Sequence, residues 1–107
     1  MQHMTAAELA GWVADSARAQ PVLLDVREPW EFEICRIAGA TPMPMKTIPA
    51  RHAELAADAP IVCICHHGAR SMQVAAFLEQ NGFTQVTNLS GGVHAWAQQV
   101  DAGMPTY

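Results

Sequence analysis

Apolar and polar residues follow one another along the chain in blocks that predict helices and buried strands in turn. The segment from Thr5 to Glu8 fits a capping box, in which each side chain bonds the backbone amide of the other residue. Apolar residues then recur at helical spacing, at Leu9, Trp12, Val13 and Ala17. This pattern predicts a helix that begins after Thr5 and buries one apolar stripe.

Three short apolar runs are typical of strands that are buried on both faces. They comprise residues 22–26, 61–64 and 86–89, and a proline precedes each of the first two. Helices are predicted at about 47–55, at 71–81 with Gly82 closing it in the left-handed conformation, and after Gly91-Gly92 through Val100. Such alternation predicts an α/β fold, with a parallel sheet flanked by helices on both faces.

The length and composition suit one small folded domain. With 107 residues and no repeat, linker or low-complexity tract, the chain is expected to form one domain over residues 1–107, with its core at about 5–105. Half of the residues are hydrophobic and 15% are charged, which excludes a disordered chain. The formal charge of −4 argues against a broad surface for nucleic acid.

The chain carries no sequence signal for a membrane or for export. No apolar run approaches the roughly 20 residues of a membrane helix. The segment from Met1 to Met4 lacks the basic and apolar regions of a signal peptide. A cytoplasmic location is therefore expected.

Candidate chemistry concentrates between Cys63 and Ser71. A buried strand ends at Cys65, a short turn follows, and a helix is expected to begin near Arg70 or Ser71. Ligands of parallel sheets lie at the carboxyl ends of the strands, where this turn must lie. The amides of this turn and the N-terminus of the following helix favour the binding of a small anion, and Gly68 permits the backbone conformation of the turn. A cysteine at this place is expected to ionise readily.

Four segments in order resemble the signatures of one family. They are Asp25-Val26-Arg27-Glu28 with Trp30-Glu31-Phe32, Ile37-Ala38-Gly39-Ala40 through Pro42-Met43-Pro44, Cys65 to Arg70, and Leu89-Ser90-Gly91-Gly92 with Trp96, Gly103 and Pro105. Together they resemble the single-domain rhodaneses, the thiosulfate sulfurtransferases, over nearly the whole chain. The sequence departs from that family at Cys35-Arg36, where Gly-His is usual, and at His66 and His67, where many members carry arginine or lysine.

The resemblance implies a mechanism centred on Cys65. This residue would take the outer sulfur of thiosulfate or a similar donor as a persulfide, and pass it to cyanide or a thiol. The backbone of the substrate-binding residues would hold the anionic sulfur; these are His66, His67, Gly68, Ala69 and Arg70. No cofactor is implied. The expected partners are a small anionic sulfur donor and a thiol or cyanide acceptor. A protein that accepts sulfur is a further candidate partner. Neither nucleic acid nor a membrane is expected as a partner.

Two other functions remain open from the sequence. One is a non-catalytic rhodanese-like module that binds or regulates a partner, although such modules often lose the cysteine that this chain keeps. The other is a relative of arsenate reductases or phosphatases. Related phosphatases have one more residue between cysteine and arginine than the four that separate Cys65 from Arg70, so sulfur transfer is favoured.

The remaining cysteines and histidines have simpler interpretations. Cys63 is expected in the core, and Cys35 is expected to be a partly buried bystander rather than a resolving thiol for Cys65. The grouping of Cys63, Cys65, His66 and His67 lacks the spacing and the second ligand pair of a structural zinc site, so no metal is predicted there. His52 and His94 are expected at the surface or in packing contacts.

The sequence also predicts roles for charged and titratable residues near the ends of the predicted strands. Asp25 and Glu28 are expected to bond loop amides, and Arg27 either faces the pocket or forms a structural salt bridge. The charge of His66 and His67 depends on pH, so the affinity for doubly charged thiosulfate is expected to weaken above neutral pH.

Overall fold

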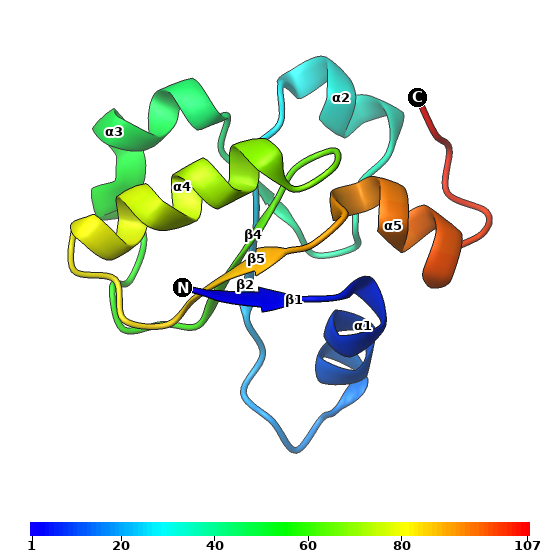
Figure 1. Ribbon diagram of the computed structural model, residues 1–107, viewed down its shortest axis with the longest axis horizontal. Coiled ribbons are helices and arrows are strands. Elements are labelled where there is room, and N and C mark those ends of the chain that lie inside the picture. The colour runs from blue at the N-terminus through cyan, green and yellow to red at the C-terminus, as the bar shows by residue number, and fades with distance from the viewer.

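The computed structural model describes all 107 residues and contains a five-stranded sheet in the order β1-β5-β4-β2-β3 (Figure 1). The strands are β1 (Gln2–Met4), β2 (Val22–Asp25), β3 (Thr41–Pro42), β4 (Ile61–Ile64) and β5 (Val86–Leu89). Every neighbouring pair is parallel. The most buried strand, β4, therefore occupies the centre of the sheet and carries the candidate loop at its carboxyl end.

Helices cover both faces of this sheet. They are α1 (Ala6–Ala14), α2 (Pro29–Ile34), α3 (Ile48–Arg51), α4 (Ala69–Gln80) and α5 (Gly92–Gln99). One apolar core lies under α1 and α5, and includes Leu9, Val62 and Trp96. The other lies under α3 and α4, and includes Ile48 and Leu78. The predicted α/β fold, with helices on both faces of a parallel sheet, is confirmed.

Several local predictions are also confirmed. The amide of Glu8 donates to Thr5 Oγ1 at 3.1 Å, and the amide of Thr5 donates to Glu8 Oε1 at 3.0 Å, so the capping box begins α1. Gly82 follows α4 with a φ of +90°. All three apolar runs are strands. None of the helices has the length and apolar character needed to cross a membrane.

The prediction of a continuous helix over 47–55 is wrong. Only Ile48–Arg51 is α-helical, between two 3₁₀ turns, Met45–Thr47 and His52–Glu54. Pro49 has no amide hydrogen, so it can stand in the first turn of α3 but cannot continue a helix from the preceding residues. In addition, α4 begins at Ala69, one or two residues before the predicted start near Arg70 or Ser71, and β1, α2 and β3 were not predicted.

Candidate functional site

Cys65 lies directly after the central strand β4, at the start of a loop that leads into α4. Its side chain is buried, with only 1% of the residue exposed. Gly68 ends the loop with a φ of +109°, in the left-handed region where a glycine avoids strain, and α4 begins at the next residue. The predicted strand, turn and helix are therefore present, and they place the cysteine at the carboxyl edge of the sheet.

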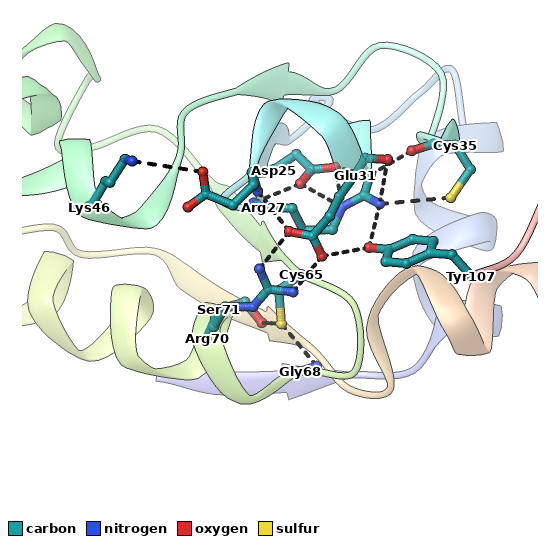
Figure 2. A network of polar contacts seen from close by, with 11 residues as sticks. Asp25, Arg27, Glu31, Cys35, Lys46, Cys65, Gly68, Arg70, Ser71 and Tyr107 are labelled. Carbon is teal, nitrogen blue, oxygen red and sulfur yellow. Dashed lines mark hydrogen bonds and ion pairs between the residues drawn. The ribbon is translucent and has the colours of Figure 1, made fainter. Parts of the chain in front are cut away.

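Two donors contact the sulfur of Cys65 directly (Figure 2). The amide of Gly68 donates to Sγ at 3.0 Å, and the hydroxyl of the buried Ser71 lies 3.3 Å from it. Ser71 Oγ also lies 2.5 Å from Asn88 Oδ1, while Asn88 Nδ2 donates to the Gly68 carbonyl at 3.2 Å. Asn88 of β5 thus supports both groups that contact the sulfur.

The other amides of the loop have no acceptor. The backbone N–H groups of His66, His67, Ala69 and Arg70 donate no hydrogen bond within the protein. Those of Ala69 and Arg70 belong to the first turn of α4, where amides have no helical partner. Free amides around a helix N-terminus favour a bound anion. The loop residues predicted to bind substrate therefore carry unused donors.

The N-terminus of α5 packs against the outer side of the loop. The amides of Val93 and His94 donate to the carbonyls of Cys65 and His66, at 2.9 and 3.1 Å. Gly92 precedes them with a φ of +56°, and a Cβ atom there would lie 2.3 Å from the Cys65 oxygen. Only glycine leaves room for this approach.

The guanidinium of Arg70 is paired with a carboxylate that the sequence did not assign. Two hydrogen bonds of 2.8 Å join its nitrogens to the two carboxylate oxygens of Glu31, in α2. Figure 2 shows Arg70 beside Cys65, reaching toward Glu31. This hydrogen bonding raises the pKa of Arg70, and it lowers the pKa of Glu31 to about 2. The predicted cation is present near the cysteine, but Glu31 compensates its charge.

Arg27 forms a structural salt bridge, one of the two roles expected for it. Its side chain is fully buried and donates to both carboxylate oxygens of Asp25, with the shortest contact at 2.7 Å. It also donates to the Cys35 carbonyl at 2.7 Å and the Glu31 carbonyl at 3.2 Å. Burial by itself would lower the pKa of Arg27, but these contacts to Asp25 and one to Tyr107 raise it. Asp25 therefore holds mainly this guanidinium, although it also accepts the Arg27 amide, as predicted.

Tyr107 joins this network from a distant part of the chain. Its hydroxyl donates to Glu31 Oε1 at 2.8 Å and accepts a hydrogen bond from Arg27 at 3.0 Å. Burial raises the pKa of this hydroxyl to about 12. Its ring stacks on that of His66, with centroids 4.0 Å apart and planes 14° apart. Nothing in the sequence indicated this residue.

The three histidines at the loop differ in their surroundings. His66 is half-buried, and its burial, followed by its proximity to His67, lowers its pKa. His94, expected at the surface or in packing contacts, is half-buried with its ring centroid 4.9 Å from that of His67.

Comparison with known proteins decides the family. The profile of the rhodanese-like domain matches residues 5–99. The chain belongs to the rhodanese-like domain family. A sulfurtransferase of Allochromatium vinosum is 42% identical to it over 84 residues, which cover 78% of this chain and 76% of that protein. Thiosulfate sulfurtransferase GlpE of Pseudomonas aeruginosa is 34% identical over 74 residues, covering 69% of this chain and 67% of that protein.

The fold of this rhodanese-like domain also matches solved structures. The crystal structure of a rhodanese-like domain protein from Staphylococcus aureus superposes with a TM-score of 0.85 at 31% sequence identity, over 100% of this chain and 99% of that one. The family resemblance inferred from the four sequence segments is thereby confirmed.

The other two thiols of this rhodanese-like domain are buried. Cys63 lies within β4, as predicted, and burial, followed by the proximity of Cys65, raises the pKa of its thiol to about 12. Cys35 is 6% exposed, and its sulfur accepts a long contact of 3.7 Å from Arg27. Both thiols remain unpaired with any disulfide partner. Cys65 is therefore distinguished by its place at the loop and not by exposure.

Proposed function

We propose that this domain transfers a sulfane sulfur from thiosulfate or a similar donor to a thiol or cyanide, through a persulfide on Cys65. The observation that carries this proposal is the position of the Cys65 sulfur at the base of a loop whose four other amides have no acceptor. An anionic sulfur species is the kind of ligand that such donors stabilise.

The transfer proceeds in two displacements. The thiolate of Cys65 attacks the outer sulfur of thiosulfate, forming a sulfur–sulfur bond while sulfite leaves with the electron pair of the broken bond. The acceptor then attacks the terminal sulfur of the persulfide, and the Cys65 thiolate leaves in turn. Neither displacement needs a general base, because Cys65 attacks as the thiolate and the acceptor attacks as cyanide or as a thiolate. Neither needs a general acid, because sulfite and the Cys65 thiolate each leave as an anion.

The surroundings of the sulfur support both steps. The Gly68 amide and the Ser71 hydroxyl contact Sγ and stabilise the thiolate as attacking and as leaving group. The free amides of the loop, such as those of His66 and Ala69, can donate hydrogen bonds to the terminal sulfur or to the departing sulfite. The name of the relative from P. aeruginosa supports thiosulfate as the donor.

Mass spectrometry after treatment with thiosulfate tests this proposal. The parent protein is expected to gain one sulfur atom on the peptide that contains Cys65, and to lose it again when cyanide is added. Cys65→Ser abolishes both the mass gain and thiocyanate formation. Cys63→Ala is the matched control, because it removes a neighbouring but fully buried thiol, and it retains both.

Three results would contradict the proposal. Sulfur transfer that survives Cys65→Ser would place the chemistry elsewhere. Cys65-dependent hydrolysis of an aryl phosphate without any sulfur uptake would assign the site to the phosphatase relatives. A correctly folded parent protein that never gains sulfur from thiosulfate or from a persulfide donor would identify a binding module.

A further inference from the structure

Three histidine side chains gather at the rim of the Cys65 loop. His66 and His67 belong to the loop, and His94 belongs to the first turn of α5. Each offers one ring nitrogen, and these three atoms all lie within 4.8 Å of one another. The two displacements of the proposed sulfur transfer involve Cys65 and the backbone of the loop, and neither takes place at these imidazole rings.

The ring nitrogens of the three histidines are free. None of them forms a hydrogen bond within the protein, whereas Nδ1 of His52 contacts the carbonyls of Ile48 and Pro49 at 3.3 and 3.0 Å. His67 is exposed, and the other two are half-buried. Their nitrogens are therefore available to a ligand that arrives from solvent.

The backbone already holds the three residues together. The amide of His94 donates to the His66 carbonyl at 3.1 Å, so the two elements that supply the ligands are joined by a hydrogen bond. The stacked ring of Tyr107 restricts the orientation of His66. Nitrogens around a tetrahedral zinc ion lie about 3.4 Å apart, given zinc–nitrogen bonds of about 2.1 Å. Coordination of one zinc ion therefore requires the three nitrogens to move closer together, by rotation of side chains such as that of the exposed His67.

We propose that His66, His67 and His94 form a binding site for a divalent cation of the Zn²⁺ or Cu²⁺ class. Neutral imidazole is a preferred ligand of these ions, whereas Mg²⁺ and Ca²⁺ prefer oxygen. Three protein ligands leave a fourth position open to solvent, as in catalytic zinc sites. This site differs from the grouping with Cys63 and Cys65 considered from the sequence, because all of its ligands are histidines and one comes from α5.

The site lacks one feature of tight metal sites. The second ring nitrogen of a metal-bound histidine usually donates to a carboxylate or carbonyl, and such outer partners contribute about 10–100-fold in affinity. No histidine of this cluster has such a partner. We therefore expect micromolar rather than nanomolar affinity for Zn²⁺.

Titration with Zn²⁺ against a chromogenic chelator tests the site. The Cys65→Ser chain serves as the background, because the variant removes the neighbouring thiol as an alternative ligand. One Zn²⁺ per chain is expected. Removing an outer partner alone weakens metal binding by at least about 10-fold. His67→Gln and His94→Gln each remove a direct ligand, so each is expected to weaken Zn²⁺ binding by at least that factor. His3→Gln and His52→Gln, which change histidines outside the cluster, are expected to retain the affinity.

Cobalt(II) gives a second readout, because its visible absorption depends on the ligand geometry. The background chain is expected to give the strong absorption of four-coordinate cobalt, and His67→Gln to lose it. Since His67 is exposed, its substitution leaves the fold intact. The proposal is overturned if Zn²⁺ affinity is unchanged in both His67→Gln and His94→Gln, or if the background chain binds no Zn²⁺ at micromolar concentrations.

Discussion

The hydroxyl of Ser71 has one proton and two acceptors within reach. Asn88 Oδ1 lies 2.5 Å away and the sulfur of Cys65 lies 3.3 Å away. When Cys65 is a thiol, its own proton can be donated to Ser71 Oγ, and the serine proton bonds Asn88. When Cys65 is a thiolate, it has no proton to donate, and the Ser71 hydroxyl can donate to the sulfur alongside the Gly68 amide. The hydrogen bonding of Ser71 therefore depends on the charge of Cys65, which changes during the proposed sulfur transfer.

Replacing Ser71 with alanine is expected to slow the reaction of Cys65 with iodoacetamide by about 10-fold at neutral pH. The reason is the loss of a hydrogen bond to a charged sulfur, a contact that contributes about 1.5–3 kcal/mol. The rate is measured by mass spectrometry of the Cys65 peptide, so that the buried thiols do not interfere. Ser16→Ala, at an exposed position, is the matched control. An unchanged rate in Ser71→Ala would show that the hydroxyl does not stabilise the thiolate.

At the scale of residues, the sequence indicates only the local part of the site. The positions of Cys65 and Gly68 could be predicted, because both lie within one continuous segment of strand, turn and helix. Glu31 does not, because its bonds to Arg70 and Tyr107 span 39 and 76 positions of the chain. His94 was likewise expected only at the surface or in packing contacts, because it is the packing of α5 against the loop that brings it close to His67. Partners that depend on tertiary packing leave no short-range pattern.

The N-termini of two helices meet at the loop and play different parts. The first amides of α5, those of Val93 and His94, are bonded to loop carbonyls. The first amides of α4, those of Ala69 and Arg70, have no acceptor in the protein. One helix thus fixes the backbone of the loop from outside, while the other offers its positive end to a ligand.

Gly92→Ala is expected to unfold the loop locally and to destabilise the domain by more than about 2 kcal/mol. The new Cβ would lie 2.3 Å from the Cys65 oxygen and 2.4 Å from the His66 oxygen, at a φ that alanine rarely adopts. Gly11→Ala is the matched control. Gly11 lies inside α1 with nothing within 4 Å of its added Cβ, so alanine there is expected to stabilise the helix, by about 0.5–1 kcal/mol. Urea unfolding measures both changes.

Equal destabilisation by the two glycine substitutions would contradict this account of Gly92. Loss of Cys65 reactivity is expected in Gly92→Ala and not in Gly11→Ala, because only the first substitution disturbs the loop.

Elements with a continuous pattern were predicted from the sequence, and elements set by their neighbours were not. β4 and β5 are uninterrupted buried strands of four residues that match the predicted runs 61–64 and 86–89, although β4 ends at Ile64, one residue before the strand end expected at Cys65. β1 and β3 contain three and two residues at the two edges of the sheet. Their extended conformation depends on pairing with β5 and β2. A local sequence pattern does not indicate such pairing. The short α2 was missed for a related reason, since its only buried residue is Glu31.

Across the whole molecule, Glu31 links parts that are remote in sequence. Its carboxylate accepts bonds from Arg70 of α4 and from Tyr107, and it also accepts the Glu28 amide at the start of its own helix. These contacts lower its pKa from an ordinary value of 4.5 to about 2. Because the pKa is lowered in the folded state, the ionised Glu31 carboxylate stabilises the fold at neutral pH.

The stability of the domain is therefore expected to fall as the pH decreases from about 4.5 toward 2. A carboxyl group whose folded pKa is lowered contributes fully above its unfolded pKa, and the contribution disappears as the pH falls through the folded pKa. Glu31→Gln is expected to lower stability at neutral pH and to flatten the acid profile of urea unfolding. Glu33→Gln, at an exposed position of α2, should reproduce the parent profile. A parent-like acid profile in Glu31→Gln would contradict the assignment.

The close contact at Gly92 also has a consequence for how this domain can evolve. The first amides of α5 donate to the carbonyls of Cys65 and His66, so α5 confines the loop on its outer side. We call this side of the loop its outer wall. Inserting one residue, as in the longer loops of related phosphatases, would push the backbone against that wall or break its hydrogen bonds. We therefore expect a longer loop to be accommodated only with compensating changes at the start of α5.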